Sequence, residues 1–424
     1  RYNDLAQIIN SPNNSITNLS VTNSKDDSLD LFIRNISKST TLRSFEVILN
    51  SFSIDLSLSL TELFRVDILS ELSVIFNKEI DSLKVKHSPF EEIEIYNLKK
   101  LKFVKTPKEW NDDIIKGLII ENLREFHLEG VPLTYDQCLA ISSSLRLHTM
   151  LKSLTINNCK VGTNIKVPES LQVLDLGYND INNKDFEELV ENLKVLKNTF
   201  SLNLEANLIN SLSVGNIVTL LKRNDLCYSL NISKNLFQFE FYQDFCQLVN
   251  YCKCVSELDI SGVAIARPDS LTSFLKNQKN IRTLKVAGCS MMNESLIEFM
   301  KIFMIENSNL ISYLDISGNR ITENRYAQKL LNIIGFRKEI ETLVMKGCFD
   351  IRDSHAPLNL DKLVTSTSLI TLNLSNSRCN SNFIINKCNS EAGIDNLYLT
   401  DVNVSVTCEF KLKLLRLAID FSLC

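Results

Sequence analysis

Apolar residues recur along the chain in one pattern, L-x-x-L-x-L-x-x-N. The pattern is clearest in two places, at Leu171, Leu174, Leu176 and Asn179 and at Ile311, Leu314, Ile316 and Asn319. We take its second apolar residue as the marker of each unit, and the series then runs through Leu154, Leu174, Leu202, Leu230, Leu258, Leu284, Leu314, Leu343, Leu372 and Leu397. Successive markers lie about 28 residues apart, which indicates a repeat architecture.

Weaker matches extend the series in both directions. They place further markers at Leu19, Phe45, Leu72, Leu101, Phe126 and Leu415. In the stretch from Asn77 to Lys105, Ile93 competes with Leu101 as the marker. Together the markers predict about 16 repeats, each with a short strand at its marker.

The last position of the pattern holds an amide or a thiol in most repeats. The residues found there are Asn50, Asn77, Asn179, Asn207, Asn235 and Asn319, with Cys159, Cys289 and Cys348 in place of asparagine. The chain turns out of the strand at this point and leaves backbone groups that cannot join the sheet. We therefore expect these side chains to be buried, to bond that backbone, and to stack from one repeat to the next.

Segments of helical period lie between the strands. In Asn183 to Asn198, the apolar residues Phe186, Leu189, Val190, Leu193 and Leu196 fall on one helical face. Similar segments are Phe241 to Val249, Asp269 to Leu275, Ser295 to Met304 and Tyr326 to Ile334. One strand and one helix cannot bury their apolar faces alone, so the repeats must stack.

A chain of such units resembles the leucine-rich repeat proteins of the ribonuclease-inhibitor type, over roughly Ser15 to Leu417. Repeat number and length also resemble the repeat domain of the CARMIL actin-regulator family. We expect an α/β leucine-rich repeat solenoid, a horseshoe with parallel strands on the concave face and helices on the convex face. It would form a single domain over residues 1–424, with an N-terminal cap at 1–14, irregular repeats at 15–150, regular repeats at 151–403, and a terminal repeat or cap at 404–424.

Composition narrows the class of protein. The chain has 424 residues, of which 44% are hydrophobic and 23% charged, and this excludes a disordered chain. Its 46 basic and 50 acidic residues give a formal charge of -4, so nothing in the overall charge favours nucleic acid as a partner. No apolar run reaches the roughly 18 residues that a membrane-spanning helix requires.

The residues beside the markers predict an acidic concave face. Strand residues alternate, so the positions one before, one after and three after each marker face that surface. In the middle of the chain Lys285 is the one base among these positions, and the predicted partner-binding residues are Glu125, Glu129, Asp175, Glu205, Glu257, Asp259, Tyr313 and Asp315. Tyr313 and Tyr398 would serve as aromatic anchors for a basic segment of a protein partner. The alternative is that aspartate after the marker is a common, solvated feature of such repeats.

The cysteines indicate packing and a reducing compartment. Five of the 12 occupy packed positions of the repeat, and Cys246, Cys252 and Cys254 form a local cluster without a C-x-x-C pair or a nearby histidine. We therefore expect no zinc site. Buried thiols in register favour the cytosol or the nucleus. Seven N-x-S/T sequons point weakly the other way.

Catalytic and cofactor motifs are missing from the sequence. The four histidines are scattered, and only His127 falls on the predicted concave face, where Glu125 and Glu129 could raise its pKa. There is no phosphate-binding loop, nucleophile elbow or H-E-x-x-H motif. We expect a non-catalytic interaction scaffold or adaptor of cytoskeletal or signalling regulation, without cofactor or metal.

Two alternatives remain open. A GTPase-activating protein of the RanGAP type would use polar residues of a strand-to-helix loop, and Arg320 and Asn324 are the candidates. A structural subunit of a larger complex would use the helices or the ends. The apolar segment Leu412 to Leu423 motivates that reading, with self-association through the C-terminal end. Because the chain begins at Arg1, we also expect it to be part of a longer protein.

Overall fold

The structure is a computed structural model that divides into two compact units, Arg1–Asn207 and Leu208–Cys424. The expected single domain, with its cap and repeat boundaries, stays a prediction. The residues that the structure describes are 2–11, 14–22, 29–50, 59–60, 63, 69–77, 98–106, 111–116, 122–146, 148–161, 165–223, 226–237, 254–265, 280–305, 311–335, 339–352, 356–365, 368–379, 383–385, 396–398 and 404–406.

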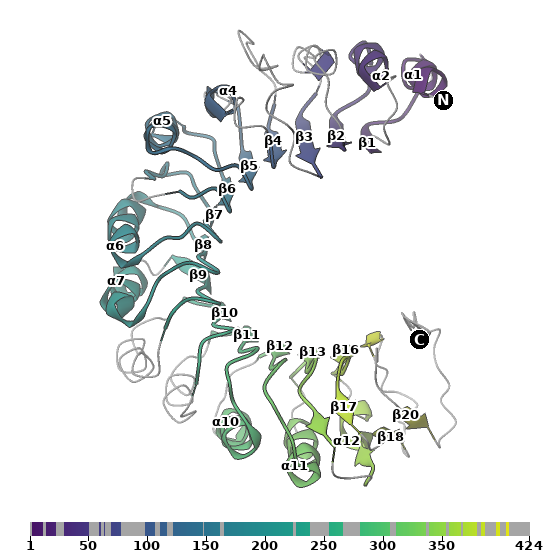
Figure 1. Ribbon diagram of the computed structural model, residues 1–424, viewed down its shortest axis with the longest axis vertical. Helices are drawn as coiled ribbons and strands as arrows, with labels where there is room; N and C mark the ends of the chain where they lie inside the picture. Colours follow the sequence, from purple (N-terminus) through teal and green to yellow (C-terminus); the bar gives the residue numbers. More distant parts are fainter. Residues whose placement is uncertain are drawn as a thin grey trace. The chain divides into compact units, whose positions relative to one another are not determined.

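The first unit contains a parallel sheet with helices on one side (Figure 1). Its strands are β1 (Asn18–Thr22), β2 (Ser44–Leu49), β3 (Glu71–Phe76), β4 (Lys100–Val104), β5 (Glu125–Glu129), β6 (Ser153–Asn157), β7 (Val173–Asp175) and β8 (Phe200–Asn203). Its helices are α1 (Tyr2–Ile9), α2 (Leu29–Ile36), α4 (Asn111–Lys116), α5 (Tyr135–Leu145), α6 (Asn183–Asn192) and the 3-10 turn Leu193–Val195. The helix predicted from Asn183 is therefore confirmed.

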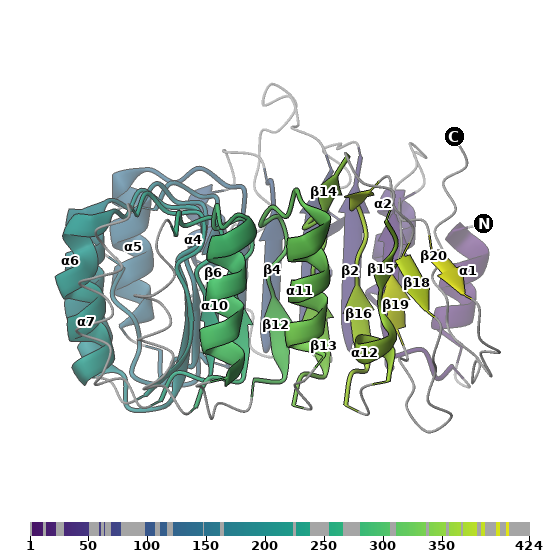
Figure 2. The ribbon, with the colours of Figure 1, turned by 90° about the horizontal axis from the view of Figure 1, so that it is seen from below.

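The second unit repeats this arrangement with shorter strands (Figure 1). The sheet contains β9 (Cys227–Asn231), β10 (Glu257–Asp259), β11 (Thr283–Lys285), β12 (Tyr313–Asp315), β13 (Thr342–Val344), β16 (Thr371–Asn373) and β19 (Asn396–Tyr398). The helices are the 3-10 turn Ser211–Ser213, α7 (Val214–Arg223), α10 (Asn293–Ile305), α11 (Asn324–Ile334) and α12 (Asp361–Val364). α10 and α11 confirm the helices predicted at Ser295 to Met304 and Tyr326 to Ile334, and Figure 2 shows them side by side.

The marker residues pair in register within each unit. In the first unit the row runs from Leu19 on β1 to Leu202 on β8. In the second it runs from Leu230 on β9 to Leu397 on β19. Leu101, the alternative to Ile93, lies on β4. Nearly every marker is fully buried, and the strands therefore stack with one apolar row facing the helices.

Asparagine side chains connect successive repeats, as the sequence predicted. Asn207 is buried, and its Oδ1 accepts from the backbone N–H of Asn179 and of Ile181, both at 3.0 Å. Its Nδ2 donates to the carbonyls of Leu176 and Leu204, both at 3.0 Å. Asn179, Asn235 and Asn319 are buried in the same role. Backbone groups freed by the turn are thus bonded within the core.

Cysteine at this position reproduces only the contact that the asparagine Nδ2 makes with a backbone carbonyl of the preceding repeat. Cys159, Cys289 and Cys348 are buried, and their Sγ atoms contact the carbonyls of Leu128, Ile260 and Ile316 in the preceding repeat. Burial raises the pKa of the Cys159 and Cys289 thiols to about 12. These groups are protonated at neutral pH, which suits a weak donor in the core.

The first two predicted asparagines depart from the rule. Asn50 is half-buried and Asn77 is exposed, and the Nδ2 of Asn77 donates to the Oδ1 of Asn50 at 2.9 Å. The prediction that both would be buried was wrong. The strands that precede them, β2 and β3, are six residues long, and the backbone N–H of Asn77 bonds the carbonyl of Leu49 at 3.0 Å. The backbone hydrogen bonds of the sheet therefore continue as far as Asn77, whereas the chain turns out of the sheet at this position in the later repeats.

The last repeats replace much of the helix with short strands. In place of a long helix, β15 (Leu358–Asn359), β18 (Phe383–Ile385) and β20 (Val404–Val406) form a parallel sheet. At another edge, β14 (Asp350–Ile351) pairs with β17 (Arg378–Cys379). The predicted α/β leucine-rich repeat solenoid is confirmed as the fold class by these stacked strands, ladders and helices. Some predictions concern residues outside the described part of the chain, namely Ile93, Phe241–Val249, Asp269–Leu275, Leu412–Leu423 and Leu415.

Candidate partner-binding surfaces

Each sheet has one face covered by helices and one face that they leave uncovered, which we call the open face (Figure 1). Side chains at the positions beside the markers lie on it, because they alternate with the buried markers along each strand. The predicted residues of the first unit are Glu125, Glu129, Asp175 and Glu205, and those of the second are Glu257, Asp259, Tyr313 and Asp315. All of them are exposed or half-buried.

In the first unit, the carboxylate at the start of β5 is neutralised by a lysine on the neighbouring strand. Lys100 lies in register between Glu71 and Glu125, and its Nζ is 3.6 Å and 3.3 Å from their carboxylates. The hydrogen bond that Lys100 donates to Glu125 is the main cause that raises the pKa of Lys100. This part of the open face therefore carries a solvated row of alternating charge.

His127 lies in the middle of β5, and its Nε2 is 3.1 Å from Glu129 Oε2. We expected the neighbouring carboxylates to raise its pKa. The structure shows the opposite, since burial lowers the pKa of His127 by more than its hydrogen bond to Glu129 raises it. Lys102, one strand away in register, also lowers it. The imidazole is thus neutral at physiological pH.

The aspartates after the markers have a structural role that the sequence did not reveal. Oδ1 of Asp175 accepts from the N–H of Gly177 at 2.9 Å. The same bond recurs in the second unit, from Ser261 to Asp259 at 3.0 Å and from Ser317 to Asp315 at 2.8 Å. Asparagine makes it at the same position elsewhere, at Asn203, Asn231 and Asn373. One oxygen of each aspartate therefore holds the turn that ends the strand.

Tyr178 contributes a contact that prediction missed. Its hydroxyl donates to Glu205 Oε1 at 2.8 Å, and its backbone has φ +59°. Asp175 also accepts from the Nδ2 of Asn203 at 3.0 Å. Asp175 and Glu205, like Glu125, are therefore held by neighbouring repeats.

In the second unit, three neighbouring strands bring charged and aromatic groups together. Register places Lys285 on β11 between Asp259 on β10 and Asp315 on β12. Its Nζ is 3.6 Å from Asp259 Oδ2 and 6.0 Å from the centre of the Tyr313 ring. Glu257 is exposed in the adjacent row, in register with Thr283 and through it with Tyr313. This group has three acidic residues and one lysine, so it carries a net negative charge on the face where the Tyr313 ring lies.

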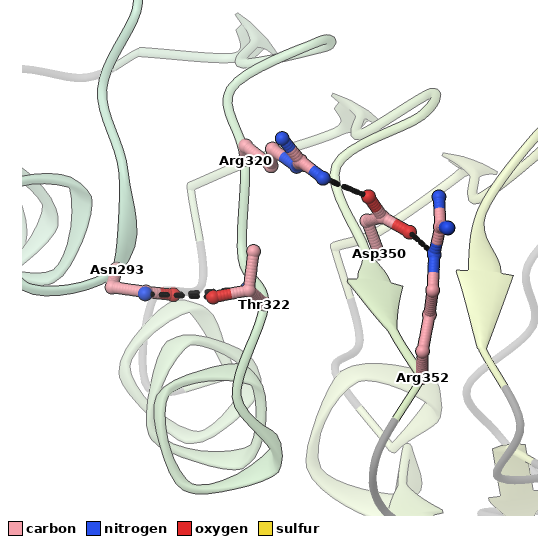
Figure 3. Close-up of polar contacts among 5 residues, drawn as sticks. All are labelled: Asn293, Arg320, Thr322, Asp350 and Arg352. Carbon is pink, nitrogen blue, oxygen red and sulfur yellow. Dashed lines mark hydrogen bonds and ion pairs between the residues drawn. The ribbon is translucent and has the colours of Figure 1, made fainter.

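The loops that follow the strands form a different surface, shown in Figure 3. Arg320 and Arg352 approach Asp350 from opposite sides. Nε of Arg320 is 3.1 Å from Asp350 Oδ2, and Nε of Arg352 is 2.9 Å from Oδ1. The hydrogen bonds from Arg352 and then Arg320 hold the pKa of Asp350 below its ordinary value of 3.8. Asn324, which the sequence placed in this loop, is the first residue of α11 and donates to the carbonyl of Ala356 at 2.8 Å.

Within the part of the chain that the structure describes, neither a cluster of metal-binding side chains nor a membrane-spanning helix is present. There, no group of three or more His, Cys, Asp or Glu side chains is placed to hold a metal ion. None of the helices seen there is long and apolar enough to cross a bilayer. Cys254 is half-buried, whereas Cys246 and Cys252 lie outside the described residues.

Comparison with solved structures returns proteins of low identity. Rad7, in its complex with Elc1 from yeast, is 16% identical, with 68% of this chain and 72% of that chain covered and a TM-score of 0.45. TLR13, in its complex with ssRNA13, is 14% identical, with 91% and 61% covered and a TM-score of 0.47. An internalin (inlF) of Listeria monocytogenes is 16% identical, with 90% and 86% covered and a TM-score of 0.43. No protein-family model and no curated protein matches the chain.

Proposed function

We propose that the protein is a non-catalytic scaffold whose open face binds a basic segment of a protein partner. The observation that carries the proposal is the group on β10 to β12, where Glu257 and Asp259 on β10 and Asp315 on β12 lie on the same face as Tyr313. A parallel sheet held by buried ladders presents these groups in a fixed array, which lowers the entropy cost of binding. An aromatic ring beside acidic groups is a suitable anchor for lysine or arginine.

The site as a whole comprises the eight predicted residues, divided between the two units. In the first unit Glu125, Glu129, Asp175 and Glu205 have partners within the chain. In the second unit Asp259 pairs with Lys285, and Asp259 and Asp315 hold the turns that follow their strands, whereas Glu257 is exposed. We also propose that the repeats are of the ribonuclease-inhibitor type and resemble those of CARMIL. The proposed location is a reducing compartment, the cytosol or the nucleus. The buried thiols Cys159, Cys289 and Cys348 support the location.

The test neutralises the second group without breaking its turns. Asn203, Asn231 and Asn373 make the turn bond at the same position, so Asp259→Asn and Asp315→Asn keep the acceptor and remove the charge. The triple variant Glu257→Gln/Asp259→Asn/Asp315→Asn is compared with the unaltered chain in binding a labelled lysine- and arginine-rich peptide. We expect affinity to fall about tenfold or more at an unchanged melting temperature.

A control removes the same number of charges from another surface. Glu294→Gln/Glu298→Gln/Glu323→Gln changes exposed side chains on and beside α10 and α11. The proposal predicts that this control binds the peptide as the unaltered chain does. Equal affinity of all three proteins would overturn the open-face site. Affinity capture of partners from native cells, with mass spectrometry, then identifies the protein that the triple variant no longer retains.

A further inference from the structure

Three arginines lie on consecutive repeats at the loop edge of the second unit. We call Arg320, Arg352 and Arg378 the arginine cluster. A backbone ladder joins their loops, because Ile321 bridges Phe349 and β14 pairs with β17, where Asp350 is in register with Arg378. The N–H of Arg378 also bonds the carbonyl of Phe349 at 2.7 Å. At about 4.8 Å between neighbouring strands, the cluster spans about 10 Å.

The carboxylate within the cluster is covered, while the guanidinium groups are exposed. Asp350 keeps 14% of its side chain exposed, against 55% for Arg320 and 63% for Arg352. One negative charge holds two positive ones, so these three residues carry a net charge of +1, and exposed Arg378 adds another. Arg320 pairs with Asp350 through Nε and Nη2 (Figure 3), so the third guanidinium nitrogen, Nη1, takes no part in this pair.

Arg325 provides the contrast. It is 72% exposed and pairs with Glu323, which is itself 46% exposed. An approaching anion there meets a carboxylate as readily as a guanidinium group. At the arginine cluster it meets the guanidinium groups first, because the carboxylate lies between them and is largely covered. Guanidinium groups held in place in this way bind carboxylates with little further loss of side-chain freedom.

We propose that the arginine cluster is a second docking site, which binds an acidic segment of a protein partner. About three extended residues span the cluster, and glutamates two positions apart would reach neighbouring arginines. Met292, whose backbone bridges Arg320, is half exposed and offers an apolar contact beside the charges. A protein segment fits better than nucleic acid, since the chain as a whole carries a formal charge of -4. This site is independent of the open face and of opposite charge.

The experiment measures fluorescence anisotropy of a labelled glutamate-rich peptide with the full chain. The double variant Arg320→Glu/Arg352→Glu should weaken binding about tenfold or more. Arg325→Glu, the matched control, should bind as the unaltered chain does, and so should the neutralised open-face variant. Arg320→Gln/Arg352→Gln repeats the test without charge reversal if the first variant melts at a lower temperature.

Three results would overturn the proposal. The peptide would fail to bind the unaltered chain, or Arg325→Glu would lose as much affinity as the double variant. Alternatively, a single-stranded RNA of similar length would displace the peptide and lose its own affinity in the double variant, which would identify nucleic acid as the ligand. A failure here leaves the open-face test unaffected, because that test uses a basic peptide and other residues.

Discussion

In most repeats of this protein, the turn that ends the strand contains a residue whose backbone is in the left-handed conformation, with positive φ. It lies four positions after the marker, at Lys105, Gly130, Asn158, Tyr178, Ala206, Lys234, Gly262, Gly288, Gly318, Gly347 and Asn376. Only some of these are glycine, although a left-handed backbone costs other residues roughly 1–2 kcal/mol. Because the residue type at this position varies, the sequence pattern did not predict that the backbone must be left-handed there.

Two opposite substitutions test that conformation. Gly288 has φ +62°, and an added Cβ would meet nothing within 4 Å, so Gly288→Ala should lower the free energy of unfolding by about 1 kcal/mol through backbone strain alone. Ala206 has φ +54°, and Ala206→Gly should raise it by about 0.5 kcal/mol, since relief of strain exceeds the added chain entropy. Urea denaturation measures both. Equal, near-zero effects would contradict the assignment.

Two histidines should make stability depend on pH. Burial lowers the pKa of His127 and of His148 below the ordinary value of 6.5. The unfolded chain therefore binds protons before the folded chain does, so the free energy of unfolding is highest above about pH 6.5 and falls as the pH drops toward the folded pKa values. Urea midpoints measured from pH 7.5 downward should decline, and less steeply in His148→Gln. Identical pH profiles would contradict this account.

At the scale of the element, the asparagine ladder ties each strand to the next. Asn207→Ala should lower the free energy of unfolding by about 3 kcal/mol, because it leaves buried N–H groups of Asn179 and Ile181 without their acceptor. Asn77→Ala, at the same position of an early repeat, should change it by less than about 0.5 kcal/mol, since Asn77 is exposed. Thermal and urea unfolding of both variants compare them. Similar losses would show that burial does not set the ladder's contribution.

The period of the sequence was sufficient to predict the strands that carry the markers, but not the short strands β14, β15, β17, β18 and β20. Markers from Leu19 to Leu397 recur at a spacing that only stacked repeats satisfy, and their register follows. Contacts between repeats were harder to predict, because they depend on loop geometry. The sequence contains Arg320, Asp350 and Arg352, yet nothing in their spacing shows that one carboxylate joins both arginines. The hydrogen bonds by which Asp259 and Asp315 hold their turns could not be predicted for the same reason. The sequence therefore indicated only the charge of these residues and not their structural role.

At the scale of the molecule, two surfaces of opposite charge follow from one repeat. Residues beside the markers give an acidic open face, and residues after the turn give the arginine cluster, both within Leu208–Cys424. A repeat fixes the positions of its side chains but leaves their identity free, so neighbouring surfaces can differ in charge. The two proposed sites would therefore bind a basic and an acidic segment at separate places of this unit.

The central claim is that the open face of β10 to β12 contacts the partner. Carbodiimide labelling of carboxylates, read by mass spectrometry with and without the basic peptide, tests it residue by residue. The account predicts that the peptide protects Glu257, Asp259 and Asp315 and leaves Glu294, Glu298 and Glu323 labelled as before. Unchanged labelling of the first three at saturating peptide, or equal protection of both sets, would contradict it.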